Sequence, residues 1–264
     1  MSDVTTAPIL TRVDNAVGVI TIHRPATLNA LNTETLLALE DALTQMEKDP
    51  AVRAIVFTGA GEKAFVAGGD IADLNSRQGL AHYQEFAEVI HRVFRRIEVC
   101  DKPTIGAING WALGGGTELL LALDIRLVAE DARLGLPEIT LGLFPGAGGT
   151  QRIIRQIPLC RAKELMFTGD QITAQEAVQL GLANRTVPKA TLMEESMALA
   201  QRIAAKSPIT LKLLKRTLRD GADMPLSAAI GHEQAMIGLV LDSQDAHEGC
   251  SAFLEKRKPQ FVGR

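Results

Sequence analysis

Three short apolar runs constrain the fold of this chain more than any other feature of its sequence. Residues 54–58 (AIVFT), 104–108 (TIGAI) and 125–129 (IRLVA) have the length of strands and few polar side chains. Strands of this kind are typical of sheets that helices cover on both faces. Stretches that favour helix, residues 80–97 and 117–123, lie among them. This alternation predicts an α/β protein built of layered helices and strands.

The N-terminal part adds a hairpin and a helix to this plan. Residues 9–13 and 17–22 are rich in β-branched side chains and flank a three-residue turn, which predicts a β-hairpin. A helix follows, with Asn32 or Thr33 as its N-cap, and ends before Pro50. Its buried face has helical spacing and consists of Leu36, Leu39, Leu43 and Met46.

The character of the sequence changes after residue 191. Strand patterns stop there, and four helical segments follow. Turn and cap residues separate these segments: Ser207-Pro208, Gly221 and Asp242-Ser243. We therefore expect two parts, a core of residues 1–190 that contains the functional site and a helical C-terminal region of residues 191–264.

Composition and charge exclude several classes of protein. The chain has 264 residues, of which 46% are hydrophobic, and its net charge is −3 at pH 7. Because a general nucleic-acid binder usually carries a basic excess, no nucleic-acid partner is expected. The richest apolar run, residues 119–123, stops at Asp124 and is far too short to span a membrane, so no membrane partner is expected.

The cysteines and the N-terminus indicate the compartment. Cys100, Cys160 and Cys250 are an odd number without metal-site spacing, which favours buried thiols in a reducing compartment over a disulfide framework. The first residues, among them Asp3 and Arg12, lack the apolar core of a secretory signal. We therefore expect a cytoplasmic protein.

Common cofactor and nucleophile motifs are missing or incomplete. Residues 59–64 (GAGEKA) fit the dinucleotide pattern G-x-G-x-x-A, but Gly68 and Gly69 follow at once and would interrupt the helix that the motif requires. We interpret this segment as a tight turn after a strand. Neither G-x-x-x-x-G-K-[ST] nor G-x-S-x-G occurs, and the five histidines lack metal-ligand spacing. No metal site is predicted.

Three glycine-rich segments stand apart from the rest of the chain. They are residues 65–70 (FVAGGD), 109–119 (NGWALGGGTEL) and 136–152 (LPEITLGLFPGAGGTQR). Glycine lets a backbone approach a ligand closely and present its N–H groups. Gly114, Gly115 and Gly116 precede the predicted helix, so their N–H groups lie at a helix N-terminus and can face a negative charge. A second N–H, from Gly69, would complete a two-donor oxyanion hole.

Two glutamates lie within these segments. Glu118 falls in the first turn of the predicted helix, and Glu138 follows Pro137 in an apolar stretch. Taken singly, Glu118 can be a capping residue that interacts with the helix dipole, and Glu138 can be a carboxylate hydrogen-bonded to a loop. Taken together, they suggest paired acid–base work, in which mutual repulsion raises the pKa of one of them.

The three segments together resemble the crotonase (enoyl-CoA hydratase/isomerase) superfamily, and within it most closely the enoyl-CoA hydratases. The resemblance extends over nearly the whole chain, from residues 28–31 (LNAL) to residues 253–258 (FLEKRK). It implies a core of repeated ββα units and a C-terminal helical part that packs against neighbouring subunits in a trimer or a dimer of trimers. The apolar faces of residues 230–241 and 246–253 are compatible with such packing.

The resemblance also implies a reaction, the addition of water to a 2-enoyl-CoA thioester, with coenzyme A as part of the substrate and no cofactor. The N–H groups of Gly69 and Gly115 would hold the thioester oxygen. Glu118 would act as the base and Glu138 as the acid, on either side of a water molecule. The implied substrate-binding residues, on the path of the CoA arm and beside the water, are Gly69, Asp70, Ile71, Ala72 and Gly146.

Two positions depart from the family pattern. Gly69 stands where many members have Ala, which leaves the N–H donor in place on a more flexible turn. Ala72 stands where hydratases often have Lys, so that contact to the CoA phosphates is missing. Lys256 and Lys258 are the remaining candidates for that contact, although a solvated helix end is the simpler interpretation of their charge run.

Three alternatives remain open. The first is an enoyl-CoA isomerase, which typically needs one carboxylate, and the second is a hydratase for branched, aromatic-derived or dicarboxylic acyl groups. The third is a non-catalytic RNA-binding homologue, against which the net charge counts. Residues 75–97 would shape the acyl pocket, with Tyr83, Phe86 and Phe94 as candidate walls or as ordinary core.

Overall fold

A six-stranded sheet forms the centre of the protein. The computed structural model describes residues 7–264, so Asp3 lies outside the described residues. The strand order is β1-β2-β3-β5-β7-β10, with β1 antiparallel to β2 and every other pair parallel. The strands are β1 (Ile9–Asp14), β2 (Val17–Ile22), β3 (Ala54–Gly59), β5 (Thr104–Ile108), β7 (Ile125–Ala129) and β10 (Arg185–Val187).

The apolar runs of the sequence occupy the middle of this sheet. The predicted strands 104–108 and 125–129 are confirmed as β5 and β7, and the strand predicted at 54–58 extends to Gly59 as β3. Every residue of β3 and β5 is buried, as expected of strands covered on both faces. The predicted hairpin is also confirmed, and its two-residue turn places Asn15 and Ala16 at positive φ, the geometry that matches the twist of the flanking strands.

A second, smaller sheet runs beside the first. Its strand order is β4-β6-β8-β9, and β4, β6 and β8 each follow directly on a strand of the large sheet. A helix comes after each of these strand pairs, which gives the repeated ββα pattern. Close approach between the repeats depends on Gly116, since a Cβ there would lie 2.0 Å from the Val66 carbonyl oxygen. The strands are β4 (Ala64–Val66), β6 (Trp111–Leu113), β8 (Arg133–Gly135) and β9 (Gln171–Thr173).

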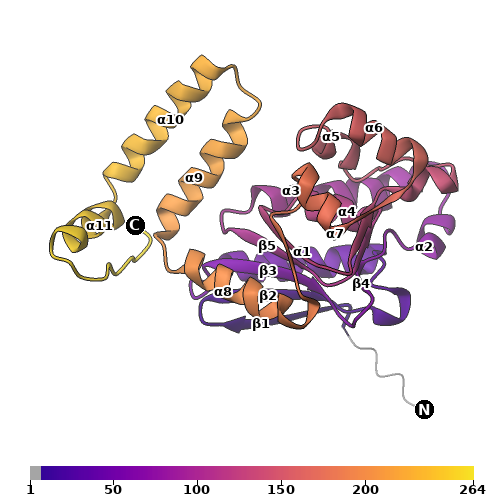
Figure 1. Ribbon diagram of the computed structural model, residues 1–264, viewed down its shortest axis with the longest axis horizontal. Helices are drawn as coiled ribbons and strands as arrows, with labels where there is room; N and C mark the ends of the chain where they lie inside the picture. The colour runs from indigo at the N-terminus through magenta and orange to yellow at the C-terminus, as the bar shows by residue number, and fades with distance from the viewer. Residues whose placement is uncertain (1–6) are drawn as a thin grey trace, which may run out of the picture.

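Helices cover the sheets as their sequences predict (Figure 1). In α1 (Thr33–Lys48), Asn32 is the N-cap and accepts a hydrogen bond from the Thr35 N–H, while the four predicted apolar residues are buried. The helical stretch predicted at 80–97 is confirmed, and within it a π-helical turn, His82–Ala87, continues into α3 (Glu88–Val99). The other core helices are α2 (Ile71–Asn75), α4 (Gly115–Leu121), α5 (Gly149–Ile153), α6 (Leu159–Thr168) and α7 (Ala174–Leu180).

Four helices follow residue 191, as predicted. The first, α8 (Leu192–Ala204), packs on strands of the large sheet. The next three, α9 (Pro208–Gly221), α10 (Leu226–Leu241) and α11 (Gln244–Leu254), form an arm that extends away from the sheets (Figure 1). Every residue of α9 and α10 is at least partly exposed. Among the described residues, no helix is both long enough and apolar enough to cross a membrane.

One sequence-based expectation needs correction. Cys100 is buried, but Cys160 and Cys250 are exposed, because they lie on outward-facing positions of α6 and α11. The final charge run lies beyond α11, which ends at Leu254, and within it Arg257 pairs with Glu248 through two hydrogen bonds of 2.6 and 2.8 Å.

Candidate active site

The four residues predicted to carry the chemistry meet in one cavity of about 770 Å³. Gly69, Gly115, Glu118 and Glu138 all lie on its wall, although they come from three separate glycine-rich segments. The ends of β4 and β6, which are neighbours in the small sheet, bring the first two segments together. The third segment begins after β8, the next strand of the same sheet.

The backbone amides of Gly69 and Gly115 lie side by side. A Cβ on Gly115 would lie 3.5 Å from the Gly69 nitrogen, so the two backbone segments approach within about the width of a side-chain methyl group. Gly69 is bridged to Leu31 through its neighbours, since the Leu31 N–H donates to the Gly68 oxygen and the Asp70 N–H donates to the Leu31 oxygen. Its own N–H therefore points to the opposite side. Among residues 7–264, neither glycine N–H donates to a protein acceptor.

Glu118 is held by two backbone amides at the floor of the cavity. It lies in the first turn of α4, and its Oε1 accepts hydrogen bonds from the N–H groups of Ala147, at 2.7 Å, and Gly149, at 2.8 Å. Burial raises the pKa of the Glu118 carboxyl above its usual value, and the two amides offset part of this effect. The amides fix one oxygen and leave Oε2 for another partner.

Glu138 has a different environment. It lies in the short 3₁₀ turn Pro137–Leu141, and neither of its buried carboxyl oxygens has a hydrogen-bond partner among the described residues. Its own backbone N–H lies nearby without the geometry of a hydrogen bond and lowers the pKa in part, by more than the charge of Glu118 raises it. Burial, with a further contribution from the charge of Glu118, raises the pKa of Glu138 to about 7. A buried carboxyl without partners is costly unless it is protonated or binds a ligand.

The two glutamates therefore have different surroundings, although burial raises the pKa of both. Glu118 accepts two amide hydrogen bonds, which favour its anionic form, whereas Glu138 can stay protonated near neutral pH. Gly114, at φ +52°, leaves the Glu138 carboxyl its space, because a Cβ there would lie 3.2 Å from Oε1. The cavity thus brings together two carboxyl groups and two N–H groups that donate to no acceptor among residues 7–264.

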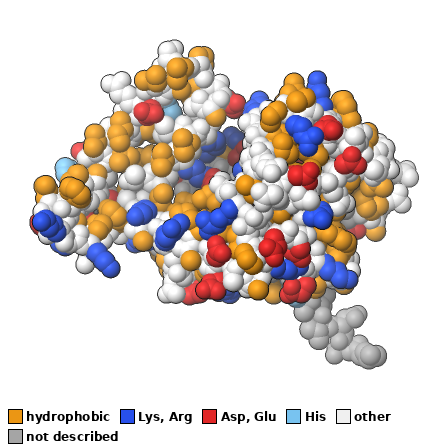
Figure 2. Space-filling model, in the orientation of Figure 1, with side chains coloured by type: hydrophobic (Ala, Val, Ile, Leu, Met, Phe, Trp, Pro, Cys, Tyr) orange, Lys and Arg blue, Asp and Glu red, His pale blue; other side chains and the backbone are white. Residues whose placement is uncertain are grey.

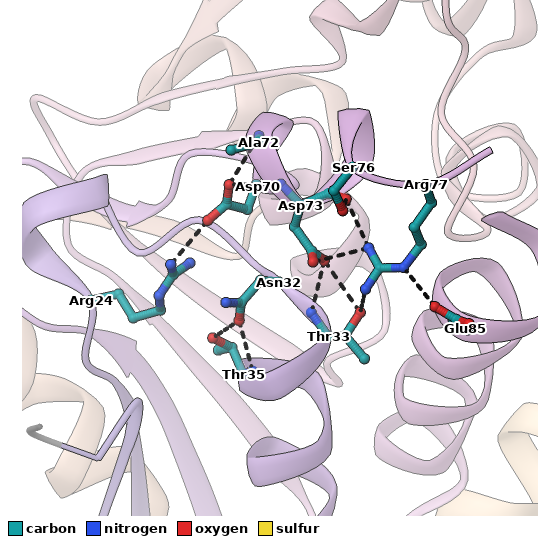
Figure 3. Close-up of polar contacts among 10 residues, drawn as sticks. All are labelled: Arg24, Asn32, Thr33, Thr35, Asp70, Ala72, Asp73, Ser76, Arg77 and Glu85. Atoms are coloured by element: carbon teal, nitrogen blue, oxygen red, sulfur yellow. Dashed lines mark hydrogen bonds and ion pairs between the residues drawn. The ribbon is translucent and has the colours of Figure 1, made fainter. Parts of the chain in front are cut away.

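The other predicted substrate-binding residues divide into two groups. Ile71 and Gly146 line the cavity. Asp70 and Ala72 do not: Asp70 is the N-cap of α2 and pairs with Arg24, and Ala72 is exposed in the first turn of that helix (Figure 3). Lys256 and Lys258, beyond the end of the arm, are not part of the cavity wall either.

The aromatic candidates for the acyl wall also divide. Phe86 lines the cavity, whereas Tyr83 is exposed away from it and Phe94 is fully buried in the main core. The segment predicted to shape the acyl pocket, residues 75–97, does contribute to this wall, and so does the loop that carries Glu138, with further residues that sequence reasoning did not name singly. They are His82, Ala87, Ile90, Leu141, Leu143 and Phe144.

Sequence reasoning also missed the two residues that orient Glu118. The backbone donors Ala147 and Gly149 lie in the third glycine-rich segment, 29 and 31 residues from Glu118. That segment was conspicuous because of its glycines, but a backbone N–H carries no side-chain signal that would assign it to a particular carboxylate.

Comparison with known proteins extends the motif resemblance to nearly the full length of the chain. The profile of the family described as Enoyl-CoA hydratase/isomerase matches residues 12–264. Crotonyl-CoA hydratase of Syntrophomonas wolfei is 41% identical over 256 residues, which cover 97% of this chain and 98% of that protein. Short-chain-enoyl-CoA hydratase of Clostridium acetobutylicum is 40% identical over 245 residues, 93% of this chain and 94% of that protein.

The solved structures agree with the sequences. A crystal structure of enoyl-CoA hydratase from Bacillus anthracis superposes with a TM-score of 0.94 and 39% identity, covering 97% of this chain and all of that chain. Fold, cavity and sequence thus lead to the same assignment, and the chain belongs to the enoyl-CoA hydratase/isomerase family.

Proposed function

We propose that the protein is an enoyl-CoA hydratase, which adds water reversibly to the C2–C3 double bond of a 2-enoyl-CoA thioester to give a 3-hydroxyacyl-CoA. The observation that carries this proposal is the presence of Glu118 and Glu138 in one cavity, where Glu118 accepts two backbone hydrogen bonds and Glu138 accepts none from the described residues. An isomerase needs only one carboxylate to move a proton between two carbons. A pair suits a reaction in which one group activates water while the other protonates carbon.

The N–H groups of Gly69 and Gly115 supply the electrostatic part of the mechanism. Water adds to C3 only if negative charge moves onto the thioester oxygen. Two preorganised donors stabilise that charge, by about 3 kcal/mol for each donor in comparable sites. Neither N–H has a protein acceptor among the described residues, so no internal hydrogen bond has to break when substrate binds.

The two glutamates move the protons. Glu118 removes a proton from the water while the hydroxyl oxygen bonds to C3, and Glu138 donates its proton to C2. After this step Glu118 is protonated and Glu138 is ionised. Proton exchange with solvent returns both to their starting states, so in the overall balance water supplies the hydroxyl group at C3 and the hydrogen at C2. Water and the enoyl-CoA thioester are the only reactants, so the proposed reaction requires neither a cofactor nor a metal ion.

The wall of the cavity favours a neutral, aliphatic acyl group. Among the described residues that form it, His82, Thr140 and the two glutamates are the only polar side chains, and no Lys or Arg is present. A dicarboxylic acyl group would place an anion against apolar walls without a cationic partner, which is costly. We therefore favour an uncharged aliphatic acyl chain over a dicarboxylic one.

We further propose the setting in which the enzyme works. The residues that line the cavity fall between 67 and 147, within the proposed core of residues 1–190, and leave residues 191–264 free for subunit contacts. Large apolar side chains on the arm support a homo-oligomer, a trimer or a dimer of trimers (Figure 2). The core would bind the acyl-CoA substrate, and the protein would work in the cytoplasm. We propose no nucleic-acid or membrane partner.

Hydration of crotonyl-CoA, followed by the loss of enoyl-thioester absorbance, tests the proposal. Glu118→Gln and Glu138→Gln keep the shape of each side chain but remove proton transfer, so each should lower kcat by about 10²–10⁴-fold while substrate binding is largely retained. Glu130→Gln, an exposed glutamate outside the cavity, is the matched control. Conversion of 3-enoyl-CoA to 2-enoyl-CoA without hydration would instead support the isomerase.

A further inference from the structure

We propose that Arg24 and Asp70 are a positioning pair that holds the Gly69 N–H in place for the thioester oxygen. The inference rests on the proposed function, because it assumes that the Gly69 N–H binds the thioester oxygen. Neither Arg24 nor Asp70 lines the substrate cavity. Arg24 precedes the 3₁₀ turn Pro25–Thr27, and Asp70 directly follows Gly69 and caps α2. The pair therefore links an N-terminal segment to the residue that carries one oxyanion donor.

The ion pair itself is well formed and largely shielded from water. Arg24 Nη2 lies 2.9 Å from Asp70 Oδ2, and the two side chains are only 21% and 16% exposed (Figure 3). A second guanidinium nitrogen of Arg24 donates to the Ala30 carbonyl. One side chain thus binds both the segment before Leu31 and the residue after Gly69, and a planar guanidinium does so with fixed geometry.

These two contacts enclose the backbone bridge on which Gly69 depends. The Leu31 N–H donates to the Gly68 oxygen at 2.9 Å, and the Asp70 N–H donates to the Leu31 oxygen at 2.8 Å. The Arg24 N–H also donates to Asn29 Oδ1 at 3.0 Å, which holds the start of the same segment. Because the bridge orients the peptide on both sides of Gly69, a shift of either segment turns its N–H.

The glycine at position 69 increases the need for such support. Without a Cβ the backbone there can reach more conformations, so its direction must be set by its neighbours. Stabilisation of the oxyanion depends on donors that are already in position, and a misplacement of about 1 Å can lower a rate by about 10²-fold. The ion pair acts on the residue next to the donor and so can supply this restraint.

Asp70 uses different carboxylate oxygens for capping α2 and for binding Arg24. Asp70 Oδ1 accepts from the N–H groups of Ala72, at 3.1 Å, and Asp73, at 3.3 Å, whereas Oδ2 binds Arg24. Asp70→Asn can keep the capping oxygen and replace the other with an NH₂ group, which cannot accept from the guanidinium. The substitution therefore removes the ion pair and leaves the start of α2 capped.

The test compares Asp70→Asn, Arg24→Met and Arg24→Lys in the full-length chain. Arg96→Met is the matched control, since Arg96 joins α3 to Glu47 of α1 at 2.8 Å with similar exposure and lies outside the cavity wall. We expect kcat for crotonyl-CoA to fall about 10–100-fold in Asp70→Asn and Arg24→Met, with KM changed less than about 3-fold. Arg24→Lys should be intermediate, and it also serves if Arg24→Met fails to fold.

A spectroscopic readout separates positioning from general stability. Bound butyryl-CoA, labelled with ¹³C at its carbonyl, cannot be hydrated, and its carbonyl stretch falls in frequency in proportion to the hydrogen bonds that it accepts. The shift on binding should be smaller in Asp70→Asn and Arg24→Met and unchanged in Arg96→Met. Gly69→Ala, which restricts the backbone, should restore part of the shift and of kcat when added to Asp70→Asn.

The carbonyl shift tests the positioning role of Arg24 and Asp70 without requiring that the protein hydrate a substrate. An undiminished carbonyl shift in both Asp70→Asn and Arg24→Met would overturn it, as would an equal loss in Arg96→Met. If the parent protein binds butyryl-CoA with the shift but does not hydrate crotonyl-CoA, the proposed function fails while the positioning pair is still tested by the spectra.

Discussion

The backbone N–H of Gly149 donates to Glu118 Oε1 over 2.8 Å, and the same glycine leaves no room for a side chain, because a Cβ there would lie 2.7 Å from that oxygen. Gly149 is thus required twice, as a donor and as an empty volume. Its position at the start of α5 has ordinary helical backbone geometry, so steric contact with Glu118, and not strain, explains why glycine is needed.

We therefore predict that Gly149→Ala lowers kcat for hydration by at least about 10-fold, because the added methyl group displaces the Glu118 carboxylate from its donors. The comparison is with Gly249→Ala, at a position in α11 where a Cβ would make ordinary contact with Phe261 at 3.5 Å. Steady-state kinetics of both variants check the prediction, and parent-like kcat in Gly149→Ala would contradict it.

The unpartnered carboxyl of Glu138 should cost stability above neutral pH. Its pKa of about 7 in the folded protein lies above the ordinary value of a glutamate, about 4.5, so the folded state binds more protons than the unfolded state between these values. The contribution of this group to the free energy of unfolding therefore falls as pH rises from about 4.5 to about 7. We predict that Glu138→Gln has a higher Tm than the parent at pH 8 and that the difference shrinks at pH 5, as measured by thermal unfolding.

The same pKa should shape the pH dependence of catalysis. As the acid, Glu138 must be protonated, so kcat/KM for hydration should fall as pH rises through about 7. As the base, Glu118 must be ionised, so activity should also fall on the acid side, below the raised pKa of that residue. A bell-shaped profile is expected, and Glu138→Gln should remove its alkaline limb from the residual activity. A flat profile between pH 6 and 9 would contradict the assignment of roles.

The sequence predicted those parts of the fold that depend on neighbours along the chain. The strands β5 and β7 were found to the residue because their apolar runs are bounded by local signals, and the Asn32 cap was among the two expected residues. The π-helical turn was missed, since the apolar spacing of residues 80–97 fits an α-helix equally well. In the structure the Glu88 N–H donates to the Tyr83 oxygen, five residues back, and this brings His82 and Ala87 to the same wall.

Within the site, the sequence indicated the two carboxyl groups but not the partner that each polar side chain has in the folded protein. Glu118 and Glu138 were singled out because carboxylates are rare in apolar surroundings, and the structure brings both to one cavity. The assignment of Asp70 to the substrate path followed from the family resemblance, which implied that path for residues 69–72 as a whole. Its actual partner, Arg24, is 46 residues away, and only the folded backbone brings the two together.

The π-helical wall predicts how the acyl pocket can be narrowed. Ala87 lines the cavity with a small side chain between those of Phe86 and Ile90. Ala87→Phe should fill part of the acyl space, so kcat/KM for eight- and ten-carbon enoyl-CoA should fall by about 10-fold or more relative to crotonyl-CoA. Gln84→Phe, on the exposed side of the same turn, is the control. A panel of chain lengths checks the prediction, and equal losses at all lengths would count against it.

The arm should be the surface through which copies of the chain associate. Its helices α9 and α10 carry large apolar side chains with about half or more of their area exposed, among them Leu218, Leu226, Ile230, Leu239 and Leu241. Burial of one such side chain contributes about 2 kcal/mol, so a charge in its place should weaken association strongly. We predict that the parent sediments as a trimer or a hexamer and that Ile230→Glu combined with Leu241→Glu sediments as a monomer.

Leu159→Glu is the control for this prediction, because Leu159 is a similarly exposed leucine on α6, away from the arm. It should leave the sedimentation of the parent unchanged, since solvent already surrounds that position. All cavity residues come from positions 67–147 of one chain, so the dissociated variant should still bind acyl-CoA, with loss of stability as its main defect. A parent protein that sediments as a stable, active monomer would show that the exposed apolar face of the arm serves some purpose other than self-association.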